Sequence, residues 1–244
     1  MKIAVIIIGR LDFVSQENLE LNKRLLKNCD IFIHSSEEYK LKAFDLNPVS
    51  VVLTKDDKYN CVIDTFHKIY HNEILDQKKI YHNIKHYDPN FNRIIQWIRY
   101  DDSLRTFDLE NYDVVLKWRT DIPKIQGHAD EYLKEFSTKY ENFQEFFNSD
   151  YNSKYLYMNN DLYFAGSLEK MKNCSFFHRI NDFIAKKEED YEYDTNLLEK
   201  CNLKAGKFKW LDSSTKHFDF LFTSESAMII NNLQNNLIMK SFTD

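Results

Sequence analysis

The first residues that could do chemistry are Gly9 and Arg10, which follow the apolar run Ile3–Ile8. A glycine lets the backbone approach a ligand closely, and an arginine can donate two parallel hydrogen bonds to phosphate oxygens. An ordinary turn with an arginine at the surface would use the same two residues. The pair lacks the GxGxxG pattern of a dinucleotide-binding loop. The segment therefore indicates a phosphate site or a simple turn.

The segment Lys117-Trp118-Arg119-Thr120-Asp121 carries three charged side chains at the end of a second apolar run. Unpaired charge is costly to bury, so each of these groups needs a partner. Asp121 could bind a divalent cation, which takes carboxylate oxygens and commonly also the phosphate oxygens of a ligand. An ion pair between Arg119 and Asp121 within the loop is the alternative.

Two further carboxylates lie in polar segments that border apolar ones. Asp161 precedes a short apolar stretch and a Gly166-Ser167 pair that suits a helix start, so it could face a cleft as a general base. A hairpin turn is the alternative at this position. Glu225 follows Thr223 and Ser224 ahead of another apolar stretch, and it could also be a functional carboxylate. The alternative is an ordinary helix start, for which Ser or Thr followed by Glu is typical.

The composition of the 244-residue chain limits the classes of function. A formal charge of −5 at pH 7 argues against a dedicated nucleic-acid binder, whose phosphate contacts need a basic surface. No apolar run approaches the ~20 residues that cross a bilayer, and the first one is too short for the core of a signal peptide. The four cysteines are scattered without a CxxC pair, so neither a zinc ribbon nor a disulfide framework is expected. We expect a reduced, cytoplasmic protein without a transmembrane segment.

Apolar runs and helical spacing predict the elements that must position these residues. Strands are expected at Ile3–Ile8, Asp30–His34, Ser50–Thr54 and Tyr112–Trp118, with a strand pair within Lys154–Ala165. Helices are expected over Gln16–Lys27, within Asp64–Arg105 with a break near Asp88-Pro89, after an N-cap at Ser167, and over most of the C-terminal third. Short connections at the start predict a βαβ unit, and no linker or repeat divides the chain. We expect a single α/β domain over residues 1–244, with a mostly parallel central sheet flanked by helices.

The order of these blocks resembles a known family. The start from Lys2 to Arg10, followed by a helix and Asp30–His34, is similar to glycosyltransferase-like polysaccharide-synthesis proteins of bacteria and large viruses related to the WavE lipopolysaccharide proteins. The similarity continues to about residue 230 through three further blocks. The first is Tyr112–Val115 followed by Arg119-Thr120-Asp121, the second is Asn160-Asp161 followed by Gly166-Ser167 and Met171, and the third is Ser224-Glu225. The resemblance implies a nucleotide-sugar-binding domain of the GT-A (Rossmann-like) type.

This resemblance implies transfer of a sugar from a nucleotide-sugar donor to a glycan acceptor, in polysaccharide, lipopolysaccharide or viral glycan synthesis. It implies that the nucleotide is bound by Gly9, Arg10, Lys117 and Arg119, that Mn²⁺ or Mg²⁺ is bound by Asp121, and that Asp161 and Glu225 are the catalytic carboxylates.

The segment Arg119-Thr120-Asp121 departs from the Asp-x-Asp motif of such enzymes, since it has one carboxylate where two are usual. Either Asp121 binds the metal with few protein ligands, or Arg119 offsets the charge of the diphosphate without a metal. The departure also leaves open a non-catalytic nucleotide- or carbohydrate-binding module of the same fold, or a purely structural α/β protein.

Overall fold

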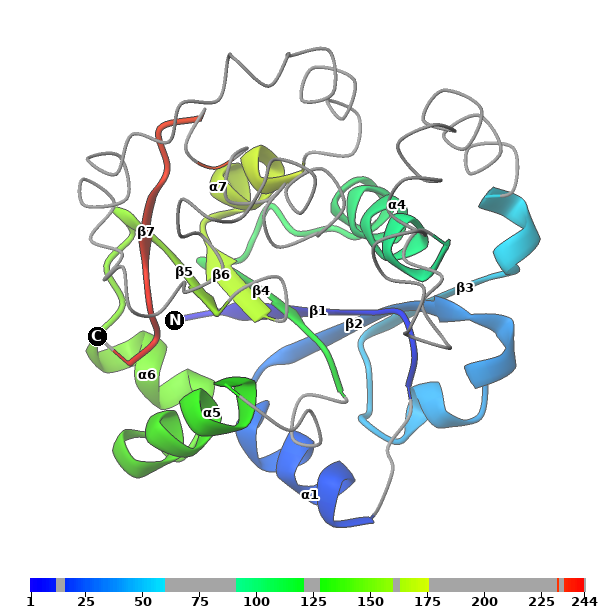
Figure 1. Ribbon diagram of the computed structural model, residues 1–244. Coiled ribbons are helices and arrows are strands. Elements are labelled where there is room, and N and C mark those ends of the chain that lie inside the picture. The colour runs from blue at the N-terminus through cyan, green and yellow to red at the C-terminus, as the bar shows by residue number, and fades with distance from the viewer. Residues whose placement is uncertain are drawn as a thin grey trace, which may run out of the picture.

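The computed structural model describes residues 1–11, 16–59, 91–120, 128–159, 163–175, 232 and 235–243. They form one open sheet with helices on both faces (Figure 1). The strands are β1 (Ile3–Ile8), β2 (Asp30–Ser36), β3 (Ser50–Thr54), β4 (Val114–Trp118), β5 (Tyr155–Asn159), β6 (Tyr163–Gly166) and β7 (Ile238–Lys240). The α-helices are α1 (Gln16–Leu25), α4 (Phe91–Thr106), α5 (His128–Lys139), α6 (Phe143–Ser149) and α7 (Leu168–Cys174), and three short 3-10 helices are η1 (Glu37–Tyr39), η2 (Lys42–Phe44) and η3 (Asp56–Tyr59).

The strand order across the sheet is β3-β2-β1-β4-β6-β5-β7. Strands β1 to β4 are mutually parallel, β6 is antiparallel to both of its neighbours, and β7 is parallel to β5. Among the described strands, β6 is therefore the one that runs in the opposite direction. The predicted mostly parallel sheet is confirmed, and the carboxyl ends of β1 to β4 lie along a single edge.

Strand β1 lies at the centre of the parallel part, paired with β2 on one side and β4 on the other. All six of its residues are buried, because helices cover both faces of the sheet. This burial explains why apolar residues at positions 3–8 do not alternate with polar ones. The strand therefore places Gly9 and Arg10 in the middle of the sheet edge formed by the carboxyl ends of the parallel strands.

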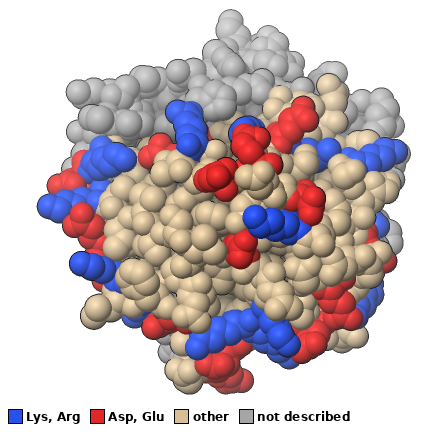
Figure 2. All heavy atoms as spheres, turned by 180° about the vertical axis from the view of Figure 1, so that it is seen from behind, with Lys and Arg blue, Asp and Glu red and all other residues tan. Residues whose placement is uncertain are grey.

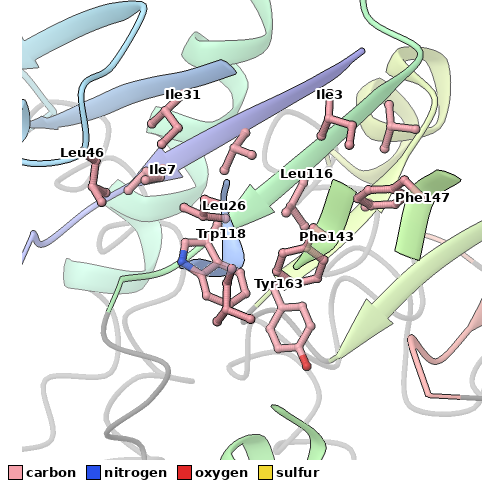
Figure 3. Close-up of a cluster of buried hydrophobic side chains, with 14 of the residues drawn as sticks. Ile3, Ile7, Leu26, Ile31, Leu46, Leu116, Trp118, Phe143, Phe147 and Tyr163 are labelled. Carbon is pink, nitrogen blue, oxygen red and sulfur yellow. The ribbon is translucent and has the colours of Figure 1, made fainter. Parts of the chain in front are cut away.

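Helices α1, α5 and α6 cover one face of the sheet, and α4 and α7 cover the other (Figure 1). On the first face, Trp118 at the end of β4 packs its ring 5.2 Å from the rings of both Phe143 and Tyr163 (Figure 3). Its indole Nε1 donates a 2.7 Å hydrogen bond to Oδ1 of Asn22 on α1. The side-chain amide of Asn22 donates in turn to the carbonyl of Thr120, so α1 is tied to the end of β4.

On the second face, α4 lies across β1 and β2, with α7 beside it. The ring of Trp97 stacks on Phe164 of β6, and the hydroxyl of Tyr100 donates a 2.7 Å hydrogen bond to the carbonyl of Met171 on α7. Helix α7 begins after Ser167, whose hydroxyl accepts from the backbone N–H of Lys170, as the predicted N-cap requires. These contacts fix α4 over the carboxyl halves of the central strands.

The predicted boundaries differ from the observed ones in a few places. Helix α1 ends at Leu25 rather than at 27, and β2 continues to Ser36, beyond the predicted end at His34. The strand predicted from Tyr112 begins at Val114, because the Tyr112 hydroxyl donates to Asp30 and its N–H closes a turn onto Leu109. The expectations for residues 64–90 and most of the C-terminal third lie outside the described residues, although β7 adds a strand where helix was expected.

Figure 2 shows the opposite side of the molecule from Figure 1. Acidic and basic side chains border a broad uncharged area there, and the described residues on this side form no continuous basic stripe. Within the described part of the chain, no helix combines the length and apolar character needed to cross a membrane.

Candidate functional site

A cavity of about 250 Å³ opens at the carboxyl ends of β1, β2 and β4. We call it the arginine cavity; it is lined by Ile8, Gly9, Arg10, Ser36, Glu38, Tyr39, Ile95, Gln96, Arg99 and Arg119. In open α/β sheets, ligands bind beyond the carboxyl ends of the strands, at the point where the strand order changes direction. That point is at β1, between β2 and β4, so the cavity occupies the expected place for a ligand.

The loop after β1 is held in place from both sides. Gly9 adopts φ = +89°, a left-handed conformation that residues with a Cβ rarely adopt. Its N–H donates to the carbonyl of His34, and its carbonyl accepts a 2.5 Å hydrogen bond from the Ser35 hydroxyl. The Thr120 hydroxyl donates to the carbonyl of Arg10 at 3.2 Å, so β2 and β4 together fix the direction in which the exposed Arg10 leaves the sheet.

Arg99 contributes a third guanidinium group to the cavity, and it comes from α4 rather than from a strand end. Only 4% of the residue is exposed. Its Nη2 donates to the Thr54 carbonyl, and both Nε and Nη2 reach the Thr54 hydroxyl, each at 3.4 Å. The guanidinium carbon also lies 5.6 Å from the centre of the Tyr59 ring. Two strand-end contacts and one aromatic face therefore set the position of this charge.

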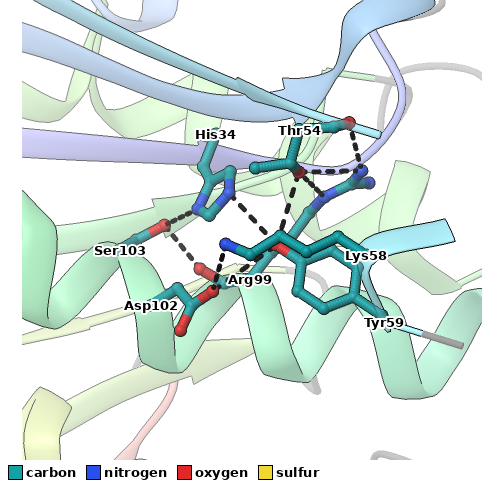
Figure 4. Close-up of polar contacts among 7 residues, drawn as sticks. All are labelled: His34, Thr54, Lys58, Tyr59, Arg99, Asp102 and Ser103. Carbon is teal, nitrogen blue, oxygen red and sulfur yellow. Dashed lines mark hydrogen bonds and ion pairs between the residues drawn. The ribbon is translucent and has the colours of Figure 1, made fainter. Parts of the chain in front are cut away.

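A buried polar cluster lies behind Arg99, between β2, β3, η3 and α4 (Figure 4). The Ser103 hydroxyl donates a 2.6 Å hydrogen bond to the Arg99 carbonyl, which uses its single proton. Nδ1 of His34, 3.1 Å away, is therefore the donor to Ser103 Oγ. Nε2 lies 3.4 Å from the Tyr59 hydroxyl, which donates to the Asp102 carboxylate. A neutral imidazole that carries its proton on Nδ1 is compatible with these contacts.

The electrostatics of this cluster agree with a neutral imidazole. Burial, together with the nearby Arg99 charge, lowers the pKa of His34 to about 4, and the Asp102 carboxylate opposes this shift. On the neighbouring turn of α4, burial raises the pKa of Asp101 to about 7, with Arg105 opposing the shift. The Ser175 hydroxyl donates to the Asp101 carboxyl, which joins α4 to the end of α7.

His34 and Asp101 should make the free energy of unfolding depend on pH in opposite directions. Between pH 4 and 6.5, unfolded His34 binds a proton that the folded state does not, so its contribution to stability is lost as the pH falls. Between pH 3.8 and 7, folded Asp101 holds a proton that the unfolded state releases, so its contribution is lost as the pH rises. Relative to the parent protein, Asp101→Asn should gain stability progressively from pH 4 to 7, by up to ~4 kcal/mol.

His34→Asn should show the reverse trend, gaining relative stability as the pH falls from 6.5 to 4. Urea unfolding at a series of pH values measures both trends. Curves for the two variants that run parallel to the parent curve would contradict the assigned protonation states.

Four more polar residues line the cavity: Gln96 comes from α4, and Ser36, Glu38 and Tyr39 come from the end of β2 and the turn after it. Ser36 ends the strand, and Glu38 and Tyr39 belong to η1. Tyr39 is half-buried, and Nζ of Lys42 lies 5.9 Å from the centre of its ring. An aromatic ring in a cavity wall is a surface on which a base can stack. A carboxylate just beyond the second parallel strand, as Glu38 is, can accept hydrogen bonds from ribose hydroxyls.

The described lining does not suit a divalent cation. It contains one carboxylate, Glu38, against three guanidinium groups, whereas Mg²⁺ and Mn²⁺ take mainly carboxylate and other oxygen ligands. Across the described ranges, no three His, Cys, Asp or Glu side chains are grouped so that they could bind a metal ion. Asp121 lies outside the described residues, and its metal-binding role stays a prediction.

The structure brings together three of the predicted site residues, Gly9, Arg10 and Arg119. Lys117 lies elsewhere: it is fully buried on the α4 face of β4, with Nζ 5.6 Å from the centre of the Phe164 ring, and it is not among the lining residues. Asp161 and Glu225 lie outside the described residues, so their catalytic roles stay predictions.

Sequence reasoning missed Arg99, Glu38 and Tyr39. A weak signal for Arg99 exists, because it follows Ile95 by four residues and so shares the buried face of its helix. A charged residue on an apolar helix face needs partners and is a reason to look for a site.

No protein-family model, no curated protein and no solved structure matches this chain.

Proposed function

We propose that the protein is a cytoplasmic glycosyltransferase with a GT-A-type domain. It binds a nucleotide-sugar donor in the arginine cavity and transfers the sugar to a glycan acceptor in polysaccharide, lipopolysaccharide or viral glycan synthesis. The observation that carries the proposal is the convergence of Arg10, Arg99 and Arg119 beyond the Gly9 turn, at the carboxyl edge of a parallel sheet.

The charge and shape of the cavity favour a nucleoside diphosphate over a neutral ligand. Guanidinium groups match the geometry of phosphate oxygens and form bidentate, charge-assisted hydrogen bonds with them. A cavity of about 250 Å³ can take a diphosphate with part of its nucleoside. Glu38 and Tyr39 lie on the same wall and suit a ribose and a base, respectively. The sugar and acceptor would then extend out of the cavity.

The chemistry that such a site performs follows from its charges. Glycosyl transfer releases a nucleoside diphosphate, and negative charge develops on the departing phosphate oxygen as the sugar leaves. Guanidinium groups fixed before the reaction stabilise that charge without reorganising during it. The family resemblance predicts that Asp161 faces the acceptor and that Glu225 is a further carboxylate of the cleft. A carboxylate beside the acceptor can accept the proton of the attacking hydroxyl.

A non-catalytic nucleotide-binding module is the second candidate, favoured by Arg119 occupying the position of the first carboxylate of Asp-x-Asp. Both candidates bind nucleotide, and only the enzyme hydrolyses or transfers the donor sugar.

A thermal-shift panel of UDP, GDP, CMP and dTDP, and of their sugar conjugates, tests the proposal. At a ligand concentration near 100 times Kd, the matching nucleotide should raise Tm by about 5–10 °C, because binding to the folded state alone contributes ~2.7 kcal/mol. Release of free sugar from the matching donor would then favour the enzyme over the module. If no member of the panel changes Tm, both the glycosyltransferase and the nucleotide-binding module are ruled out.

Arg10→Ala should weaken binding of the matching nucleotide by ~1.5–3 kcal/mol, the scale of a hydrogen bond to a charged group. Titration calorimetry measures this change. Arg24→Ala is the matched control, since Arg24 is an exposed arginine in the last turn of α1 and is not among the residues that line the cavity. Equal affinity of the Arg10 variant and the parent would show that Arg10 is an exposed residue of an ordinary turn and does not bind the nucleotide.

A further inference from the structure

We infer that the arginine cavity holds the donor diphosphate with the guanidinium groups of Arg10, Arg99 and Arg119, so that nucleotide binding needs no divalent cation. The inference rests on the proposed function and adds to it the means by which the phosphate charge is neutralised. It follows from three properties of the described residues.

The first property is the balance of charges along the cavity wall. Three guanidinium groups face one carboxylate, and the carboxylate, Glu38, comes from the η1 segment rather than from the β1–β4 edge where two of the arginines lie. A divalent cation placed among the arginines would be repelled by each of them. A diphosphate placed there is attracted by all three.

The second property is the fixed position of Arg99. Thr54 accepts hydrogen bonds from this side chain through both its carbonyl and its hydroxyl, and the Tyr59 ring lies against the guanidinium. A guanidinium does not lose its proton at any physiological pH, so the positive charge is permanent. Arg99 therefore offers at a fixed point the charge that a bound metal ion supplies in other phosphate sites.

The third property concerns the backbone of the loop after β1. The Gly9 N–H is already used by the His34 carbonyl, so it is not directed at a ligand as in glycine-rich phosphate loops. Gly9 therefore offers no backbone N–H to a phosphate, whereas Arg10 and Arg119 line the same cavity with charged side chains. Because Thr120 and Ser35 also anchor the loop, Arg10 starts from a fixed backbone position.

The test is titration calorimetry with the nucleoside diphosphate selected by the thermal-shift panel, carried out once in excess EDTA and once in Mn²⁺. We expect the two Kd values to agree within ~3-fold. Arg119→Gln should raise Kd by at least ~10-fold in both buffers, while Arg24→Gln leaves it unchanged. Arg119→Lys, which keeps the charge but loses the planar fork, should fall between the parent and Arg119→Gln.

The outcomes separate this inference from the proposed function. Binding that appears only with Mn²⁺ and is lost in Asp121→Asn would overturn the inference and leave the proposed function standing. Binding in EDTA that is unaffected by Arg119→Gln would also overturn it. Absence of binding by every nucleotide in both buffers would overturn the proposed function, and the inference with it.

Discussion

Arg99→Gln is expected to raise the Kd for the matching nucleoside diphosphate by about 30- to 150-fold, which corresponds to ~2–3 kcal/mol. The effect should be larger than that of Arg10→Ala, because Arg99 is 4% exposed and its charge is little screened by water. Glutamine retains a polar group of similar length but loses the charge and the fork geometry. Titration calorimetry in EDTA measures the change, with circular dichroism to confirm that the variant is folded.

Thr54→Val shows whether the position of Arg99 matters as well as its charge. Valine keeps the shape of threonine but removes the hydroxyl that accepts from Nε and Nη2 of Arg99. We expect Thr54→Val alone to weaken nucleotide binding by about 3- to 10-fold, and to have no further effect when Arg99→Gln is already present. Additive losses of affinity in the double variant would mean that Thr54 affects nucleotide binding independently of Arg99 and does not position it.

Trp118→Ala is expected to lower the free energy of unfolding by ~3–5 kcal/mol. The side chain is fully buried between the sheet and the helices of its α1, α5 and α6 face, where alanine would leave a large cavity among Phe143, Tyr163 and their neighbours. It would also leave Oδ1 of the buried Asn22 without the indole N–H that donates to it. Urea unfolding measures the loss.

Trp118→Phe separates the two contributions, because it keeps an aromatic ring and removes the Nε1 donor. Its cost should be smaller, ~1–3 kcal/mol, the usual penalty for a buried polar group that loses its partner. A loss below ~1 kcal/mol for Trp118→Ala would contradict the packing described for this face.

The sequence predicts the parallel strands well, since burial on both faces leaves a continuous apolar signal. Strands β1 and β3 begin and end at the predicted residues, and β2 differs at one end only. The Gly9-Arg10 turn could be located for the same reason: it follows directly from the end of the central strand. What sequence spacing does not determine is which distant segments pair, so β7, a strand of three residues beside β5, was not expected.

Lys117 and Arg99 show which parts of the candidate site cannot be predicted from the sequence. Side chains alternate along a strand, so Trp118 and Lys117 face opposite layers, and Lys117 is enclosed beside Phe164. Within the described residues 117–120, it is Arg119, one residue past the end of β4, that lines the cavity. Arg99 reaches it from a helix that lies across β1 and β2, and this crossing depends on long-range packing of Trp97 and Tyr100. No local pattern in the sequence carries that information.

If the arginine cavity binds the diphosphate of a nucleotide-sugar donor, both phosphates must lie among its guanidinium groups. The most direct test is a crystal structure of the protein grown with the matching nucleoside diphosphate in EDTA. We predict that the two phosphates lie beyond Gly9, within hydrogen-bond distance of the guanidinium groups of Arg99 and Arg119. A nucleotide bound elsewhere, or one whose phosphates point away from these arginines, would contradict the claim.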